Sequence, residues 1–90
     1  MKITIYTDPD PRFKKDCDEA KRLLDGSGFE YIEVWLVGIV EYQPNWKNNI
    51  DERLDVSAAY NMFNHDVPII NVDGIWMTKA GIKKIVDKER

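Results

Sequence analysis

The sequence predicts a single α/β domain over residues 1–90, with a four-stranded mixed sheet and helices on both faces. Three observations support this. Short aromatic and β-branched runs alternate with segments of helical periodicity, in the order β-α-β-α-β-β-α. A helix between the first two strands requires a parallel pair with a right-handed crossover. Only Asp73 and Gly74 separate the last two strands, which predicts an antiparallel hairpin.

A change of period marks the first strand and the helix after it. Ile3 and Ile5 alternate with Lys2, Thr4 and Tyr6, as in a short strand. The next apolar residues recur at helical spacing on one face: Phe13, Cys17, Ala20, Leu23 and Leu24. Either Asp10 caps this helix, with Pro11 as its first residue, or Asp16 caps a later start.

Glycines and apolar runs set the elements in the middle of the chain. The first helix is expected to end through Gly26 or Gly28. The run 29–36, "FEYIEVWL", predicts the second strand, and 37–49 is expected to be a loop or a hairpin-like excursion. A second helix is expected over 50–64, with one apolar face made of Ile50, Leu54, Ala58 and Met62.

The last part of the chain predicts a hairpin and a helix. The runs 67–72, "VPIINV", and 75–77, "IWM", are expected to be its two strands. Residues 79–90 are expected to close the chain as a short helix that buries Ile82, Ile85 and Val86.

Composition excludes several classes of function. The formal charge is -3 with both signs scattered, so no basic field indicates nucleic acid. A single cysteine excludes an internal disulfide and a Cys-rich zinc site, and fits a reducing compartment. The N-terminus lacks the apolar run of a signal peptide, and the longest apolar stretch is too short to span a membrane. We therefore expect a cytoplasmic protein with neither membrane nor nucleic acid as a partner.

Four stretches together resemble the thioredoxin fold, and most closely the glutaredoxins: "ITIYT", "CDEAKRLL", "FEYIEVWL" and "DVPIINVDGIWM". The resemblance spans nearly the whole chain except 37–49. The longer connection between Tyr6 and Cys17 resembles the active-site loop of phage-encoded glutaredoxins. Those family members typically supply electrons to ribonucleotide reductase, so the resemblance implies a phage protein with thiol-disulfide chemistry.

The cysteine pair of that family is incomplete here. Its motif is Cys-x-x-Cys at a helix start, where the first thiolate attacks and the second cysteine resolves the mixed disulfide. In this register Cys17 falls on the resolving position, and Lys14 stands where the attacking cysteine belongs. Cys17 also lies on an apolar helix face between Asp16 and Asp18, whose charges would raise a thiol pKa. We predict a buried thiol without a lowered pKa.

The resemblance also implies a glutathione site, which is altered. Asp8 lies where the family has a lysine, and Asp66 replaces a threonine. Residues 78–83 stand where the family has Gly-Gly followed by acidic residues that open the last helix. Val67 and Pro68 are retained, and the resemblance implies a cis bond between them. Glutathione is the one candidate ligand, and we expect no bound cofactor. The groove of the family would contain Lys14, Lys15, Val67, Pro68, Trp76, Thr78 and Lys79.

Three polar residues could bind a metal or move a proton. Asp8 and Asp10 could chelate a divalent cation, but the proline spacing and the missing third carboxylate favour turn and cap roles. His65, the one histidine, could be a proton shuttle or a metal ligand. It has no evident partner set, which favours a residue that satisfies carbonyls at a helix end, and we expect no metal.

The aromatic residues allow two interpretations. Tyr31 and Trp35 alternate on a strand and can be core or half-core. Tyr42 and Trp46 lie in the segment "EYQPNWKNN", where large aromatics often mark a contact surface. Trp46 could equally fold back as a lid over the core.

Three hypotheses about function follow. The first is a glutaredoxin-like protein that has lost its nucleophile and binds another protein, through Tyr42 and Trp46 or through the old groove. The second is a thiol-disulfide oxidoreductase that uses Cys17. The third is a small anion- or nucleotide-binding module that uses Lys14, Lys15 and Lys79.

Overall fold

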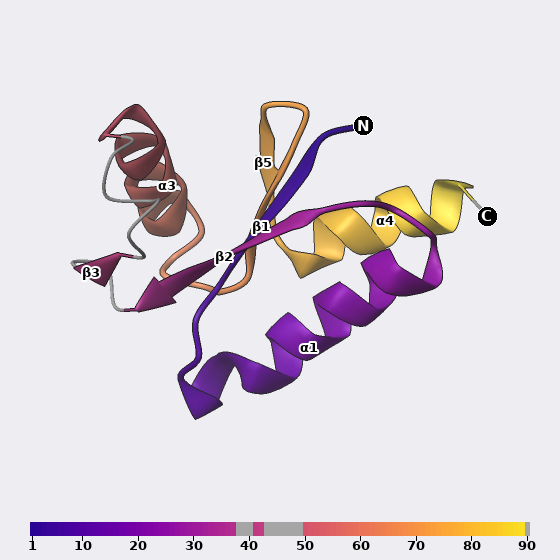
Figure 1. Cartoon of the computed structure of the whole chain (residues 1–90), viewed down its shortest axis with the longest axis horizontal. Helices are drawn as coiled ribbons and strands as arrows, with labels where there is room; N and C mark the ends of the chain where they lie inside the picture. Colours follow the sequence, from indigo (N-terminus) through magenta and orange to yellow (C-terminus); the bar gives the residue numbers. More distant parts are fainter. Residues whose placement is uncertain (38–40, 43–49, 90) are drawn as a thin grey trace.

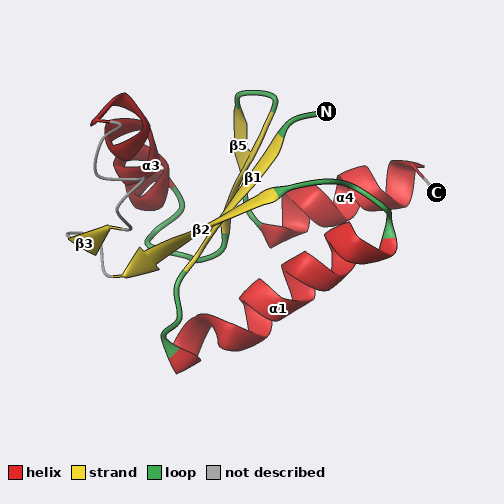
Figure 2. Ribbon diagram, viewed as in Figure 1, coloured by secondary structure: helices red, strands yellow, loops and turns green. Residues whose placement is uncertain are grey.

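The computed structural model describes residues 1–37, 41–42 and 50–89 (Figures 1 and 2). Its elements, in chain order, are β1 (Ile3–Thr7), α1 (Pro11–Gly26), β2 (Ile32–Val37), β3 (Glu41–Tyr42), α3 (Ile50–Met62), β4 (Ile69–Val72), β5 (Ile75–Met77) and α4 (Lys79–Glu89). The predicted order is confirmed, with the two-residue β3 in addition.

The strands form one mixed sheet in the order β3-β2-β1-β4-β5. β1 and β2 are parallel, as the helix between them requires, and β1–β4 and β4–β5 are antiparallel. The predicted four-stranded mixed sheet is therefore present as β2-β1-β4-β5. β3 adds a short fifth strand, because Tyr42 pairs with Leu36 in an antiparallel ladder. This arrangement of strands and helices is that of a thioredoxin-like fold.

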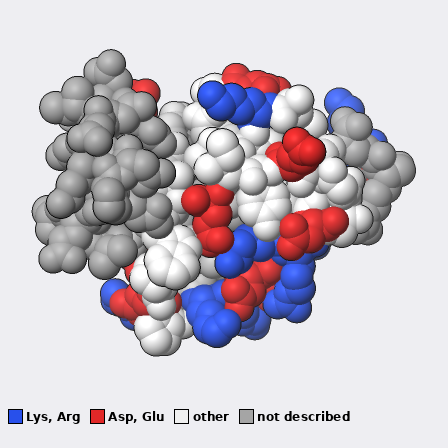
Figure 3. Space-filling model, in the orientation of Figure 1, with Lys and Arg blue, Asp and Glu red and all other residues white. Residues whose placement is uncertain are grey.

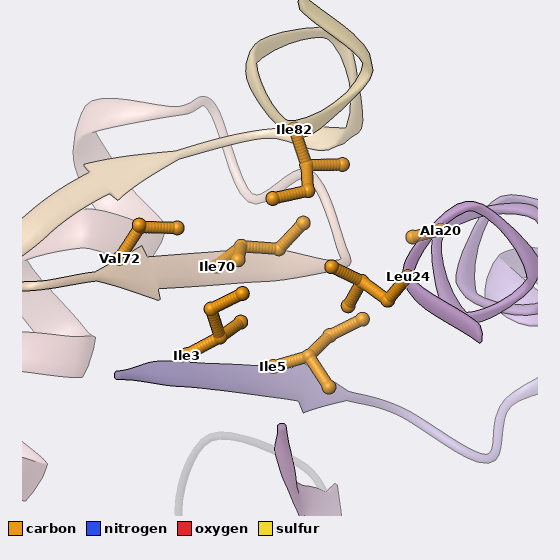
Figure 4. Close-up of a cluster of buried hydrophobic side chains, with 7 residues drawn as sticks. All are labelled: Ile3, Ile5, Ala20, Leu24, Ile70, Val72 and Ile82. Carbon is orange, nitrogen blue, oxygen red and sulfur yellow. The ribbon is translucent and has the colours of Figure 1, made fainter. Parts of the chain in front are cut away.

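Helices cover both faces of the sheet, as predicted. Figure 4 shows the apolar cluster that joins β1 and β4 to α1 and α4, made of Ile3, Ile5, Ala20, Leu24, Ile70, Val72 and Ile82. On the opposite face α3 packs against a second cluster, made of Tyr6, Val34, Leu36, Val56, Ala59 and Ile69. Burial of these side chains is the main force that holds the three layers together.

The face of α3 that packs on the sheet is not the predicted one. Leu54 and Met62 are 64% and 60% exposed, whereas Val56 and Ala59 are buried. Tyr60 and Phe63 extend the buried side. The helix has two apolar stripes, and the one with the two aromatic rings removes more apolar area from water, so it faces the sheet.

The earlier of the two possible starts of α1 is the one that forms. The Oδ1 atom of Asp10 accepts a hydrogen bond of 2.9 Å from the backbone N–H of Arg12, and Pro11 is the first helical residue. The start at Asp16 is therefore wrong, and Cys17 lies in the second turn. Among the described residues no helix is long and apolar enough to cross a membrane.

Two glycines with left-handed backbone end a helix and form a turn. Gly28, at φ +73°, follows α1, and the N–H of Phe29 bonds the carbonyl of Leu24 at 3.2 Å. Asp73 and Gly74 both have positive φ, as a two-residue hairpin of type I′ requires. Both turns were expected from these residues.

Candidate functional site

Cys17 lines a cleft between α1, the carboxyl end of β1 and one face of β2. The cleft has a volume of about 200 Å³. Its lining consists of Thr7, Asp8, Pro9, Lys14, Cys17, Asp18, Lys21, Glu33 and Trp35. We call it the thiol cleft.

The Cys17 thiol is buried, with 3% of the residue exposed. Burial raises its pKa above the ordinary value of 9.0, and the nearby carboxylates of Glu33 and Asp16 add to the rise. A hydrogen bond from the backbone N–H of Asp8 and the charge of Lys21 lower the pKa without reversing the shift. The predicted burial is confirmed, and the group is a protonated thiol at neutral pH, which is a poor nucleophile.

Lys14, which the sequence resemblance places at the attacking position, is part of an exposed ion pair. Its Nζ atom lies 2.8 Å from Oδ2 of Asp18, one helical turn further on. This contact lowers the pKa of the Asp18 carboxyl. Because α1 begins at Pro11, Lys14 lies beyond the unpaired N–H groups of the first turn. Lys15 is exposed and does not line the thiol cleft.

A polar network joins the strands to α1 at this cleft. The hydroxyl of Thr7, which is 3% exposed, donates to Oε2 of Glu33 at 2.7 Å. The Nζ atom of Lys21 lies 3.2 Å from the same oxygen. The buried hydroxyl is therefore satisfied, and residues from β1, β2 and α1 are held in one arrangement.

Trp35 forms the exposed wall of the thiol cleft. It is 50% exposed, while its neighbours Val34 and Leu36 point to the opposite face and are buried. The sequence left open whether Trp35 is a core or a half-core residue, and the half-core placement is confirmed. The sequence signal for the exposure of Trp35 was Glu33, which shares a face of β2 with it. A carboxylate at that position indicates that the sheet is open to water there.

A second cleft, of about 230 Å³, lies beside the loop between α3 and β4. The Val67–Pro68 peptide bond is cis, as the resemblance implied. The lining contains four residues expected in the groove, together with Asp16, Asp66 and Ala80; the four are Val67, Pro68, Thr78 and Lys79. We call it the proline cleft.

Lys79 in the proline cleft is clamped by two carboxylates of α1. Its Nζ atom lies 2.8 Å from Oδ1 of Asp16 and 2.7 Å from Oε2 of Glu19. Hydrogen bonds to Asp16 and Glu19 raise the pKa of Lys79, and the bond from Lys79 lowers the pKa of Glu19. The two carboxylates together carry more charge than the single ammonium group, so Lys79 offers little positive potential to an anion.

The other aromatic candidates lie elsewhere. Trp76 packs on the α3 side of the sheet, where its ring centroid is 5.5 Å from that of Tyr6. Trp76 was expected in the groove, but it lines neither the thiol cleft nor the proline cleft. Tyr42 has its backbone in β3, and its side chain and the whole of Trp46 lie outside the described residues.

His65 and the two early aspartates have local structural roles. The backbone N–H of His65 donates to the Tyr60 carbonyl at 2.7 Å, and its ring stacks on Tyr60 with centroids 4.5 Å apart. Oδ1 of Asp8 accepts from the N–H of Asp10 at 2.9 Å, which forms a turn before the helix cap. In the described part of the chain, no group of three His, Cys, Asp or Glu residues could hold a metal ion.

The sequence matches no protein-family model, and no curated protein is significantly similar to it. The fold and the two clefts define a thioredoxin-like α/β protein with a buried thiol. Function is therefore inferred from the chemistry of these clefts.

Proposed function

We propose that this protein is a glutaredoxin-like module without thiol redox chemistry, and that it binds another protein. The observation that carries the proposal is the state of Cys17. Its thiol is 3% exposed and its pKa is raised by burial. The resemblance to glutaredoxins would place Lys14 where the attacking cysteine stands. A lysine cannot exchange with a disulfide, and a protonated buried thiol attacks one slowly.

The binding surface is centred on Trp35. Tryptophan is enriched among the residues that dominate binding energy, and half of Trp35 is exposed beside a cleft of defined shape. The thiol and proline clefts are adjacent along α1, because Asp16 lines one and Cys17 the other. A partner that covers Trp35 would reach both clefts, and the segment with Tyr42 and Trp46 remains an expected additional contact.

Affinity capture with matched variants tests this proposal. The immobilised chain is exposed to extract from its native host, and bound proteins are quantified for wild type, Trp35→Ala and Ile75→Ala. Ile75 is 66% exposed on β5 and lines neither cleft, so it controls for loss of exposed apolar area. We expect a stoichiometric partner that Trp35→Ala loses and Ile75→Ala keeps. Equal recovery by all three proteins, or no specific partner, would contradict the proposal.

One observation favours a second function, that of a thiol-disulfide oxidoreductase using Cys17. The sulfur lines a cleft and accepts a hydrogen bond from the N–H of Asp8, which is a contact that stabilises a thiolate. Burial outweighs this contact, so we place this function second. Reduction of a model disulfide that depends on Cys17 would favour it over the binding module.

A further inference from the structure

α1 and α4 lie side by side on one face of the sheet (Figure 2). Residues of both helices line a groove. Its volume is about 460 Å³, twice that of the proline cleft. The lining consists of Glu19, Arg22, Leu23, Lys79, Ala80 and Lys83. Apart from Lys79 and Ala80, which also border the proline cleft, these residues belong to neither of the two clefts described above.

Leu23 and Ala80 make up the apolar part of the groove. Leu23 is partly buried and packs against the core cluster, so its position is fixed by the fold. Ala80 is exposed, and its small side chain leaves the space between the two helices open. An apolar side chain of a partner could therefore lie against Leu23 and Ala80, and its burial there would be favourable.

The polar part of the groove has an excess of positive charge. Glu19 is already paired with Lys79, which also binds Asp16. Within the described residues neither Arg22 nor Lys83 forms an ion pair, and Arg22 has one long hydrogen bond, 3.4 Å from Nε to a backbone carbonyl. Figure 3 shows basic side chains interleaved with acidic ones over α1. Arg22, whose charge helps to lower the pKa of the nearby Asp18 carboxyl, and Lys83 thus flank an apolar floor without forming an ion pair in the described residues.

We propose that this groove binds an acidic amphipathic peptide segment of another protein. Carboxylates of that segment would pair with Arg22 and Lys83, and apolar side chains between them would cover Leu23 and Ala80. A small anion would leave the apolar part unused. Nucleic acid would meet only two available cations on a chain of charge -3, which gives it little electrostatic attraction. This groove shares Lys79 and Ala80 with the proline cleft but does not include Trp35, and its acidic peptide ligand goes beyond the proposed function.

A fluorescently labelled peptide of about 12 residues, with Leu on one helical face and Glu elsewhere, is the probe. Its binding to the wild-type chain is measured by fluorescence anisotropy. The matched peptide has Lys in place of every Glu. We expect saturable binding of the acidic peptide, weakened by added salt, and no binding of the basic one. Equal binding of both peptides, or no binding of the acidic one, would overturn the proposal.

Variants of α1 and α4 locate the site. Arg22→Glu and Lys83→Glu should each weaken the acidic peptide about tenfold, since each replaces an attraction by a repulsion. Lys84→Glu makes the same change of charge on α4 outside the groove lining, and should weaken it less than about twofold. Ala80→Leu should also weaken binding, because it fills the groove and leaves both cations in place.

Two further results distinguish peptide binding in this groove from binding at Trp35 and from simple anion binding. Trp35→Ala should leave peptide binding unchanged, so failure of the groove proposal and failure of the proposed function can be told apart. Millimolar inorganic phosphate should not displace the peptide beyond its effect as a salt. Full displacement by phosphate, or equal effects of Lys83→Glu and Lys84→Glu, would show that there is no peptide site in the groove.

Discussion

The Nζ atom of Lys14 lies 2.8 Å from Oδ2 of Asp18 on the exposed side of α1, and both residues flank the buried Cys17 in sequence. The proposed glutaredoxin resemblance would put the attacking cysteine at the position of Lys14. Here this position holds a solvated ion pair, of the kind that contributes little to stability. Cys17 lies one turn further into the helix, away from the unpaired N–H groups that could stabilise a thiolate.

Lys14→Cys should create a weak disulfide reductase. Lys14 and Cys17 line the same cleft and are three positions apart in a helix, so two cysteines there could approach each other. We expect low but measurable glutathione-dependent reduction of a small disulfide, limited because Asp8 and residues 78–83 differ from the glutathione contacts that the resemblance would imply. Lys15→Cys, one residue outside the cleft, is the control and should remain inactive. Equal activity of the two variants would show that the alignment of Lys14 with the nucleophile is wrong.

The Cys17 thiol should react slowly with an alkylating reagent in the folded protein. Burial limits access, and the raised pKa keeps the thiolate fraction small at neutral pH. We expect the rate at pH 7 to rise by about tenfold or more when the chain is denatured. Lys15→Cys in a Cys17→Ala background provides an exposed thiol on the same helix as a rate standard. The same rate for Cys17 before and after denaturation would mean that the thiol is accessible.

Cys17→Ser should destabilise the fold by about 1 kcal/mol or more, because it buries a hydroxyl in place of a less polar thiol. Cys17→Ala removes the sulfur without adding a polar atom, and is the matched control. Urea unfolding of the three proteins measures the difference, and Cys17→Ser should be the least stable. If Cys17→Ser is as stable as the wild type, the side chain at this position is solvated.

The clamp of Lys79 should make stability depend on pH at both ends of the scale. The pKa of Glu19 is lowered from 4.5, so its contribution is present above that value and is lost as acid protonates the folded carboxylate. The pKa of Lys79 is raised from 10.5, so its contribution is present below that value and is lost as the folded amine deprotonates. The ion pairs of Lys79 with the two carboxylates therefore contribute to stability in the pH range between these two ordinary values.

Lys79→Met tests the clamp through the melting temperature as a function of pH. The difference between wild type and Lys79→Met should be largest in that range and should shrink in acid, as the folded Glu19 carboxylate, with its lowered pKa, becomes protonated. Lys84→Met removes an exposed charge from the same helix and should show no comparable pH dependence. A difference that persists unchanged in acid would mean that Glu19 and Asp16 do not hold Lys79.

Local chemistry is what made most of the fold predictable. The alternation around Ile3 and Ile5 placed β1, and Asp10 with Pro11 offered the helix start that forms. Asp73-Gly74 could be recognised as a turn because its residues tolerate positive φ. Each of these signals lies within a few residues of the feature it produces.

Contacts between elements that are distant in the sequence could not be predicted. The face of α3 depended on whether the sheet accepts Leu54 and Met62 or Val56 and Ala59, and both stripes fit a helix. The pairing of Lys79 with Glu19, and the groove that it borders, require α1 and α4 to lie side by side. The exposure of Trp35 likewise depends on how far α1 covers β2. The single groove predicted from the resemblance is divided in the structure between two clefts, and packing determined what lines them.

The central claim is that the unmodified chain has no thiol redox activity, and one measurement tests it most directly. Glutathione-dependent reduction of a small-molecule disulfide is followed for the wild type and for Cys17→Ala at neutral pH, with an active glutaredoxin as the positive control. The account predicts that both chains show only the rate of buffer and glutathione alone. Turnover by the wild type that Cys17→Ala abolishes would contradict it and establish the protein as an oxidoreductase.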